Sequence, residues 1–251
     1  MSPTMIGLIV MVCVFGGALL GMALRELLPE HHLSADSKDV IKMGMGLTAT
    51  MAALVLALLI ASAKSSYDAQ KNEVTQISAN IILLDRVLAH YGPQTRAARD
   101  LLRGYVALML DRIWPQERAR PVELEPTSAL ANSFYDEVEE LSPQNEAQRS
   151  LKPLAEKVAF DLAQTRWLLF AQGGSSIPMP FLALLVFWVT IIFLSFGLFA
   201  PRNVTVVATL FLCALSVSGA IFLILQLDQP FAGLIHISSA PLRNALAHLG
   251  Q

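Results

Sequence analysis

The stretch that decides the fold is MGMGLTATMAALVLALLIASA, residues 43–63, which carries no charged side chain. At about 1.5 Å of rise per residue, a stretch of this length crosses the roughly 30 Å hydrocarbon core of a bilayer as one helix. Three further uncharged apolar stretches have similar lengths, at residues 5–24, 177–200 and 204–227. Because a helix satisfies its own backbone hydrogen bonds in lipid, the sequence predicts an all-α integral membrane protein with four transmembrane helices.

The composition supports this class and excludes others. Hydrophobic residues make up 54% of the 251 residues and charged residues only 15%, which is unusual for a soluble domain of this length. Residues 64–166 hold 13 of the 18 Lys and Arg and 15 of the 20 Asp and Glu, so this middle part is expected to face water. Because the signs nearly balance and the net charge is −2, we expect no basic surface for nucleic acid.

Polar connections divide the chain into four parts. Residues 25–42 join the first two apolar stretches and residues 199–203 join the last two, so each pair forms an antiparallel hairpin. A cleaved secretory signal is the alternative for the first stretch, but no basic residue precedes it and its apolar run is longer than a signal core. We expect a first transmembrane hairpin at residues 1–63, an extramembrane helical domain at 64–176, a second hairpin at 177–227 and an amphipathic tail at 228–251.

The middle domain begins as a continuation of the second span. Continuous apolarity gives way to a heptad pattern, which is typical of a coiled-coil-like stalk and needs a partner helix. Gly92 and Pro93 end the stalk, and Ser142 with Pro143 is expected to begin the partner helix. Asp85 is expected outside the seam. The seam is interrupted only by Gln70 and comprises Tyr67, Val74, Ile77, Ile81, Leu84, Leu88 and Tyr91.

The sequence gives little support for catalytic chemistry. It contains no phosphate-binding glycine loop, no HExxH, no CxxC pair and no GxSxG elbow. His31 and His32 beside Glu30 come nearest to a metal cluster, yet adjacent histidines on a helix point in different directions. The acidic pair Glu139 and Glu140 is typical of a solvated helix face. We therefore predict a protein that is not an enzyme and that binds neither a cofactor nor a metal.

Candidate pathway residues come from the second span. A turn of about 100° per residue places small or polar residues at both ends of one stripe and apolar residues in its middle. This profile suits a water-filled path that is narrowest at Met51 and Val55, and close helix packing is the alternative. Lys42 and Lys64 would lie at the two mouths of the path. The stripe comprises Gly44, Thr48, Met51, Val55 and Ser62.

Asp228, at the end of the fourth span, is a further candidate. A carboxylate gains nothing from the C-terminal end of a helix dipole, so its position suggests a cationic partner or a cap for the following turn. Solvation by water among the lipid headgroups is the alternative reading.

Several motifs spread along the chain carry a family resemblance. They are KMGMGLTATMAALVLALLIASAKSS at residues 42–66, LDRVL at 84–88, HYG at 90–92, DRIWP at 111–115, LSPQ at 141–144 and QTRW at 164–167, together with residues 199–203 and 216–243. On these motifs nearly the whole chain resembles the bestrophin-like domain family of four-pass bacterial membrane proteins.

The resemblance implies a function and a set of partners. True bestrophins are pentameric anion channels, with two membrane helices on each side of a cytosolic helical region and a pore lined by the second helix. By analogy we expect a homo-oligomer, a pentamer, that conducts small anions within the lipid of the bacterial inner membrane. The acidic run at residues 136–140 lies between the pairs of spans rather than after the fourth, so the calcium-binding clasp of bestrophins has no counterpart here.

A second hypothesis belongs to a different class. It is a non-conducting membrane protein whose helical domain binds a partner or senses the state of the envelope. Both hypotheses predict the same topology and differ in whether an open axial path exists. Basic residues near the spans divide equally between the two sides of the membrane, so the expected cytosolic position of the middle domain rests on the analogy alone.

Overall fold

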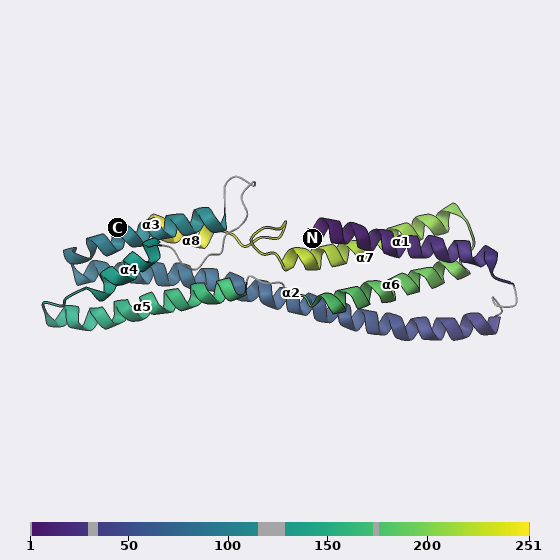
Figure 1. Cartoon of the computed structure of the whole chain (residues 1–251), viewed down its shortest axis with the longest axis horizontal. Coiled ribbons are helices and arrows are strands. Elements are labelled where there is room, and N and C mark those ends of the chain that lie inside the picture. Colours follow the sequence, from purple (N-terminus) through teal and green to yellow (C-terminus); the bar gives the residue numbers. More distant parts are fainter. Residues whose placement is uncertain (1, 30–34, 115–128, 173–175, 251) are drawn as a thin grey trace. The chain divides into compact units, whose positions relative to one another are not determined.

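The computed structural model describes residues 2–29, 35–114, 129–172 and 176–250. Within these ranges the regular elements are all helices (Figure 1), which confirms the predicted all-α class. The chain divides into two compact units. We call Met1–Ser65 with Ser175–Asp228 the membrane unit, and Ser66–Gly174 with Gln229–Gln251 the helical unit.

Four helices long and apolar enough to cross a membrane supply the membrane unit. Each predicted span falls on one of them, and the fourth span has the predicted bounds. Capping residues in the sequence fix where two of these helices begin. Ser2 accepts a hydrogen bond from Met5 N at the start of the first, and Asn203 caps the start of the last. They are α1 (Pro3–Leu27), the first part of α2 (Ala35–Tyr91), α6 (Met179–Phe199) and α7 (Val204–Leu227).

Glycines bring α1 and α6 into close backbone contact. A Cβ atom added at Gly21 would lie 2.0 Å from the carbonyl oxygen of Leu194, and one added at Gly197 would lie 1.9 Å from that of Ala18. Only residues without a side chain allow this approach. In lipid, where burial alone drives no association between helices, such contact supplies the packing energy. The small residues of the first span are therefore explained by packing.

The second helix is a single element of 57 residues, α2. Its length follows from the sequence, because neither Gly nor Pro occurs between Leu47 and Tyr91. It ends at Gly92, whose φ of 128° is unfavourable for other residues, followed by Pro93. It begins at Ala35, within the polar connection that precedes the second span. Glu30, His31 and His32, which come nearest to a metal cluster in the sequence, lie outside the described residues.

Five elements around the second part of α2 form the helical unit. α3 packs against α4 and α8, and α4 packs against α5. The predicted seam of α2 is buried in this core: Val74, Ile77, Ile81, Leu84, Leu88 and Tyr91 are each at most 3% exposed. Residues 229–250, which follow the fourth span, belong to this unit through α8. The elements are η2 (Pro93–Thr95), α3 (Arg96–Ile113), α4 (Ala129–Glu139), α5 (Glu146–Ala171) and α8 (Ala240–His248).

The predicted start of the partner helix is wrong by one turn. α5 begins at Glu146 rather than after Ser142, because Asn145 caps it by accepting a hydrogen bond from Gln148 N at 2.8 Å. The Gln148 side chain completes the turn by accepting from Gln144 N at 2.7 Å. An asparagine cap backed by a reciprocal glutamine contact outcompetes the upstream Ser-Pro pair.

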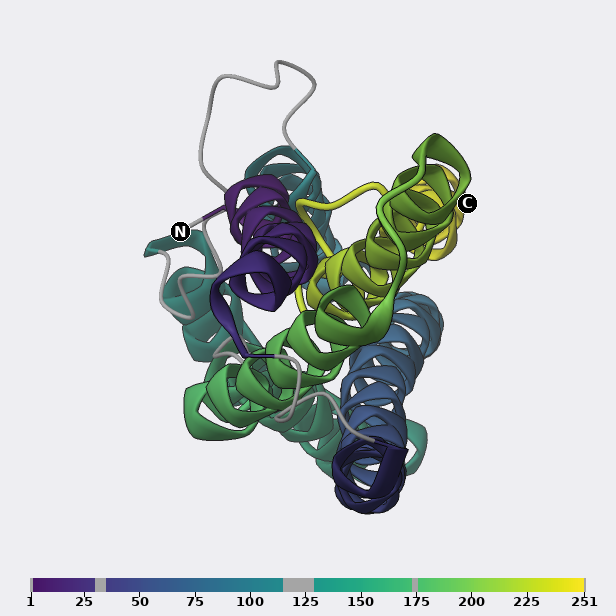
Figure 2. The ribbon, with the colours of Figure 1, turned by 90° about the vertical axis from the view of Figure 1, so that its right-hand side faces the viewer.

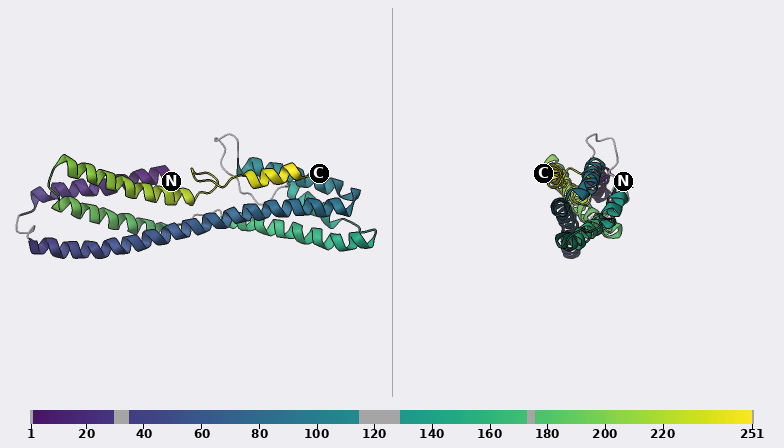
Figure 3. Two further views of the ribbon diagram at one scale, coloured as in Figure 1. Left: turned by 180° about the vertical axis from the view of Figure 1, so that it is seen from behind. Right: turned by 90° about the vertical axis from the view of Figure 1, so that its left-hand side faces the viewer.

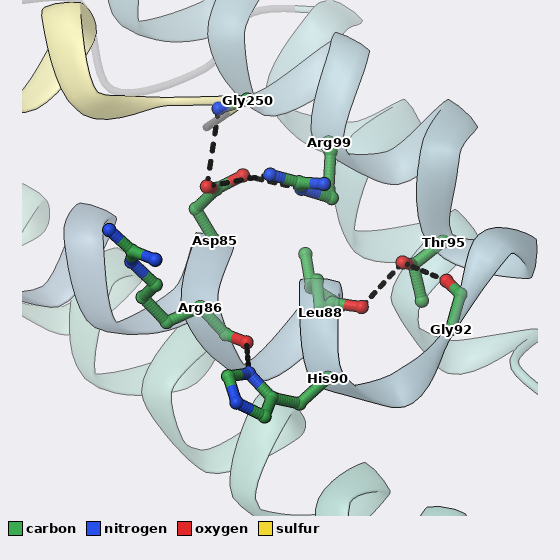
Figure 4. A network of polar contacts seen from close by, with 8 residues as sticks. All are labelled: Asp85, Arg86, Leu88, His90, Gly92, Thr95, Arg99 and Gly250. Carbon is green, nitrogen blue, oxygen red and sulfur yellow. Dashed lines mark hydrogen bonds and ion pairs between the residues drawn. The ribbon is translucent and has the colours of Figure 1, made fainter.

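Asp85, which is predicted to lie outside the apolar seam, is nevertheless buried. It is 2% exposed and receives two hydrogen bonds from Arg99 on α3, Nε to Oδ1 at 2.7 Å and Nη2 to Oδ2 at 3.0 Å. Gly250 N, beyond α8, donates to the same carboxylate at 3.3 Å (Figure 4). Nearby, the buried Thr95 hydroxyl lies within hydrogen-bond distance of the carbonyl oxygen of Leu88, at 2.6 Å. Asp85 thus joins three segments of the helical unit.

Candidate ion pathway

The first part of α2 is the least buried of the four membrane helices. In its apolar segment 11% of the residues are buried inside the chain, against 39% in α1, 33% in α6 and 22% in α7. In Figures 1 and 3 α6 runs between α1 and this part of α2, and in Figure 2 α2 lies at the edge of the membrane unit. Most of its surface is therefore left to lipid or to another molecule.

One narrow face of α2 packs against the membrane unit. Ala52, Leu59 and Ala63 are buried there, at spacings of seven and four residues that keep them on one side of the helix. The rest of the circumference is open. One open face carries large apolar side chains, Met43, Leu47, Leu54 and Leu58. Its neighbour carries small residues, Gly46, Ala53, Ala57 and Ala61.

The predicted pathway stripe follows one border between the buried and the open surface. Gly44 and Met51 are exposed, and Thr48, Val55 and Ser62 are half-buried. Val55 packs against the apolar core of the membrane unit. The stripe is therefore continuous along the helix, but only Gly44 and Met51 are exposed to a molecule outside this chain.

The hydroxyl groups on the stripe already have acceptors. Thr48 Oγ1 donates to the carbonyl oxygen of Gly44 at 3.0 Å, and Ser62 Oγ donates to that of Ser176 at 3.4 Å. A hydroxyl that donates to its own backbone presents its oxygen lone pairs outward, and these repel an anion. Either hydroxyl would have to rotate to stabilise a passing anion.

The two lysines expected at the mouths are exposed. Lys42 Nζ lies 3.6 Å from Asp39 Oδ1, and both side chains are more than half exposed. A pair this open to water contributes little energy, so it does not hold the lysine firmly in place. Lys42 can therefore still act on ions at the membrane surface.

Asp228 caps the end of α7 and binds the segment that precedes α6. Its Oδ1 accepts hydrogen bonds from Ser176 N at 2.7 Å and from Ser176 Oγ at 2.6 Å. These contacts tie the two ends of the second hairpin together at one side of the membrane unit. Sequence reasoning could not identify Ser176 as the partner, because 52 residues separate it from Asp228.

A polar cluster in the helical unit centres on Gln172, just after α5. Gln70 Nε2 donates to the Gln172 carbonyl oxygen at 3.3 Å, and Gln172 Nε2 donates to Glu73 Oε1 at 2.6 Å. Burial raises the pKa of Glu73 above its ordinary 4.5, and the hydrogen bond from Gln172 opposes that rise. In the sequence, Gln70 stands out as the polar residue that interrupts the apolar seam. Its hydrogen bond to Gln172 explains why a polar side chain occupies this position.

The fold and these sites define an all-helical, four-span membrane protein with a helical unit between its two hairpins. The family model for the bestrophin-like domain matches residues 12–242. The chain therefore belongs to the bestrophin-like family, as its motifs predict.

Two solved structures resemble the whole chain. Both are crystal structures of a bacterial bestrophin homologue from Klebsiella pneumoniae, each carrying a point mutation. The first has a TM-score of 0.67 and 13% sequence identity, and the match covers 97% of this chain and 99% of the homologue's chain. The second has a TM-score of 0.63, 13% identity and coverages of 95% and 99%. At this identity the likeness establishes a shared fold. No curated protein matches the sequence.

Proposed function

We propose that the protein is an oligomeric bestrophin-like channel that conducts small anions along a path lined by α2. The observation that carries the proposal is the open surface of α2 within the membrane unit. A membrane helix whose apolar segment has only 11% of its residues buried has room for a neighbouring copy on one side and an axial path on another. The family membership and the shared fold with a bestrophin homologue support the same conclusion.

The channel requires several copies of the chain. Four membrane helices, three of which pack mainly on one another, cannot enclose a water-filled path alone. Copies arranged around an axis would cover the open faces of α2 and leave one stripe of each copy towards the axis. By analogy with bestrophins we propose a homo-pentamer in the bacterial inner membrane, with the helical unit in the cytosol.

The proposed path runs along the stripe Gly44, Thr48, Met51, Val55 and Ser62. Residues 43–63 contain no charge, so an apolar ring at Met51 and Val55 would close the path by expelling water. Lys42 and Lys64 would raise the local anion concentration at the mouths. Met51, which is 43% exposed, is the most exposed large side chain on the stripe.

Paired substitutions on α2 test the path. Met51 and Ile60 are both 43% exposed, and their separation of nine residues puts them on opposite sides of the helix. We expect Met51→Ser, in purified protein reconstituted into liposomes, to raise anion flux about tenfold by wetting the constriction, and Ile60→Ser to leave flux near the wild-type value. Equal effects of the two variants, or no flux from an intact oligomer, would reject the path.

One observation favours the second candidate, a non-conducting protein that binds a partner. The hydroxyls of Thr48 and Ser62 donate within the chain, and Val55 packs against its own core. Close helix packing requires such contacts within the chain, whereas a water-filled path does not require them. Liposome flux decides between the candidates, and mass photometry of the detergent-solubilised protein tests the assembly, since a monomer cannot form the proposed path.

A further inference from the structure

The outer side of α2 in the helical unit carries an exposed stripe. Its residues recur every three or four positions, on the side of the helix opposite the buried seam. Leu83, within the stripe, is 47% exposed. Among the described residues Arg86 has no ion-pair partner, and Figure 4 shows its guanidinium apart from the polar contacts around Asp85. The stripe comprises Asn72, Thr75, Ala79, Leu83, Arg86 and His90.

A second surface is the open groove between α4 and α5, which has a volume of about 500 Å³. Phe160, on its α5 side, is 67% exposed. Of the described residues that line the groove, Glu139 and Glu156 carry a charge. Lys152 offsets one of them, because its Nζ lies 3.6 Å from Glu156 Oε1, so the groove keeps an excess of acid. Lys157 is turned about 100° away from Glu156 around the helix, to the side of Phe160 opposite the groove.

The two surfaces are complementary. Each exposes a large apolar side chain next to charge, in a unit that the sequence predicts to face water, and such patches mark sites of protein contact. The charge beside Leu83 is basic, whereas the groove is acidic. Figure 1 shows α4 in front of α2 within the helical unit, and the left panel of Figure 3, seen from behind, shows α2 in front. The two surfaces therefore lie on different sides of the unit, as contacts between successive copies in a ring require.

Contacts between α2 and α5 fix how these two helices are aligned. The end of α2 lies beside the start of α5, where Gln148 Nε2 donates to the Tyr91 carbonyl oxygen at 2.8 Å. Beyond the other end of α5, Gln172 Nε2 donates to Glu73 Oε1 at 2.6 Å. The two helices are thus antiparallel, with a known contact near each end of the paired segments.

The exposed apolar side chains lie near the middle of these segments. Leu83 is 10 residues from one α2 contact and 8 from the other, and Phe160 is 12 residues from each contact of α5. At about 1.5 Å per residue, the two lie within about one helical turn of the same height. A rotation about an axis along the helices keeps every residue at its height, so Leu83 of one copy can meet Phe160 of the next. Because the helices are antiparallel, Arg86 then lies at about the level of Glu156.

We propose that copies of the chain join through these two surfaces, with the α2 stripe of one helical unit in the α4–α5 groove of the next. Leu83 packs on Phe160, and Arg86 forms an ion pair with Glu156 across the contact. The inference rests on the proposed oligomer and names the surfaces that hold its copies together in the helical unit. Conduction along the α2 path is a separate property of the membrane unit.

Charge reversal in the full-length protein in detergent tests the ion pair, with mass photometry as the measure of assembly. We expect Arg86→Glu and Glu156→Arg each to raise the concentration at which half of the oligomer dissociates about tenfold, because each places like charges in the contact. The combined variant restores opposite charges and should bring this concentration back to within about twofold of the wild-type value. A groove occupied by a different partner would give no such rescue.

Matched controls come from the same unit. Arg243→Glu and Asp111→Arg reverse exposed charges that line a separate cavity between α3 and α8, so both should leave assembly at the wild-type level. Phe160→Ser tests the apolar half of the contact and should weaken assembly about tenfold. Leu154→Ser is its control, since Leu154 is an exposed apolar residue on another side of α5.

Two results would overturn the contact alone. One is an oligomer that Arg86→Glu, Glu156→Arg and Phe160→Ser all leave intact. The other is a combined variant that dissociates as readily as either charge reversal. A monomeric wild-type protein would overturn the contact and the proposed channel together, whereas absence of anion flux from an oligomer that shows the rescue would count against conduction only.

Discussion

The membrane unit and the helical unit hold their helices together by different means. In the membrane unit, backbones touch: Gly21 and Gly197 each leave no room for a methyl group against the facing helix. In the helical unit, an apolar seam is combined with buried polar contacts, such as that of Asp85 with Arg99. In water, the hydrophobic effect drives the burial of the apolar seam of the helical unit. In lipid, close contact between helices is the main source of attraction in the membrane unit.

The comparison explains where polar groups are tolerated. The membrane unit's buried Ser218 donates chiefly within its own helix, to the Ala214 carbonyl oxygen at 2.7 Å, and its hydroxyl also lies 3.6 Å from Met11 Sδ on α1. In the helical unit, Asp85 and Gln148 instead connect segments far apart in the sequence. Asp85 and Gln148 are thus connectors in the helical unit, whereas the buried Ser78 donates within its own helix, to the Val74 carbonyl oxygen at 2.8 Å. Four substitutions test this contrast, beginning with the largest expected effect.

Arg99→Met should destabilise the helical unit by about 3 kcal/mol, because it leaves the carboxylate of Asp85 buried without its partner. Thermal unfolding in detergent measures the loss. The double variant Asp85→Leu with Arg99→Met removes both charges and should recover most of the stability. A double variant as unstable as the single one would show that the ion pair itself, rather than the uncompensated charge, decides the outcome.

Gly21→Ala should destabilise the membrane unit by about 2 kcal/mol, because the new methyl group would lie 2.0 Å from the Leu194 carbonyl oxygen and the helices must separate. Gly16→Ala is the control, since a Cβ atom there meets nothing within 4 Å. Unfolding of both variants in the same detergent compares them. Equal stability would remove close backbone contact as the distinguishing feature of this unit.

Asn145→Ala should cost about 1 kcal/mol, the usual contribution of a helix cap, whereas Ser142→Ala should cost almost nothing. The Ser142 hydroxyl has only a long contact, 3.5 Å, with the Glu140 carbonyl oxygen. Urea unfolding of both variants measures the difference. A larger loss for Ser142→Ala would restore the helix start that the sequence predicts.

Glu73→Gln should give the smallest change, in the pH dependence of stability. Because the folded-state pKa of Glu73 is raised above 4.5, the folded protein binds more protons than the unfolded chain between 4.5 and that raised value. Its ionisation therefore lowers stability as pH rises through this window. Thermal unfolding from pH 4.5 upward should show a weaker decline in the variant, which keeps an acceptor for Gln172. An unchanged pH profile would mean that Glu73 ionises freely.

Residues with strong local signals were predicted well. Four uncharged apolar stretches specified four spans, since only a helix satisfies the backbone in lipid. The heptad seam of α2 was found for a similar reason, because its burial follows from periodicity along one helix. Ser142 was misjudged because a Ser-Pro pair resembles a helix start until the competing side chain of Asn145 is considered.

Residues whose environment depends on distant segments could not be predicted. Asp85 is 14 residues from Arg99, Asp228 is 52 from Ser176, and Arg166 is 61 from Tyr105. Periodicity places Asp85 on the outer side of the seam, yet α3 and residue Gly250 cover that side. A charged side chain reads as exposed in the sequence whenever its partner comes from another element.

The sequence by itself determined the class of the protein, its four membrane helices, the long second helix and the family, because hydrophobicity, periodicity and the absence of helix breakers act along one segment at a time. The tertiary structure alone decided which face of α2 stays open, where α1 and α6 touch, and that Asp85 meets Arg99. These properties depend on three-dimensional neighbours, and packing chooses those neighbours from residues that the chain order keeps apart.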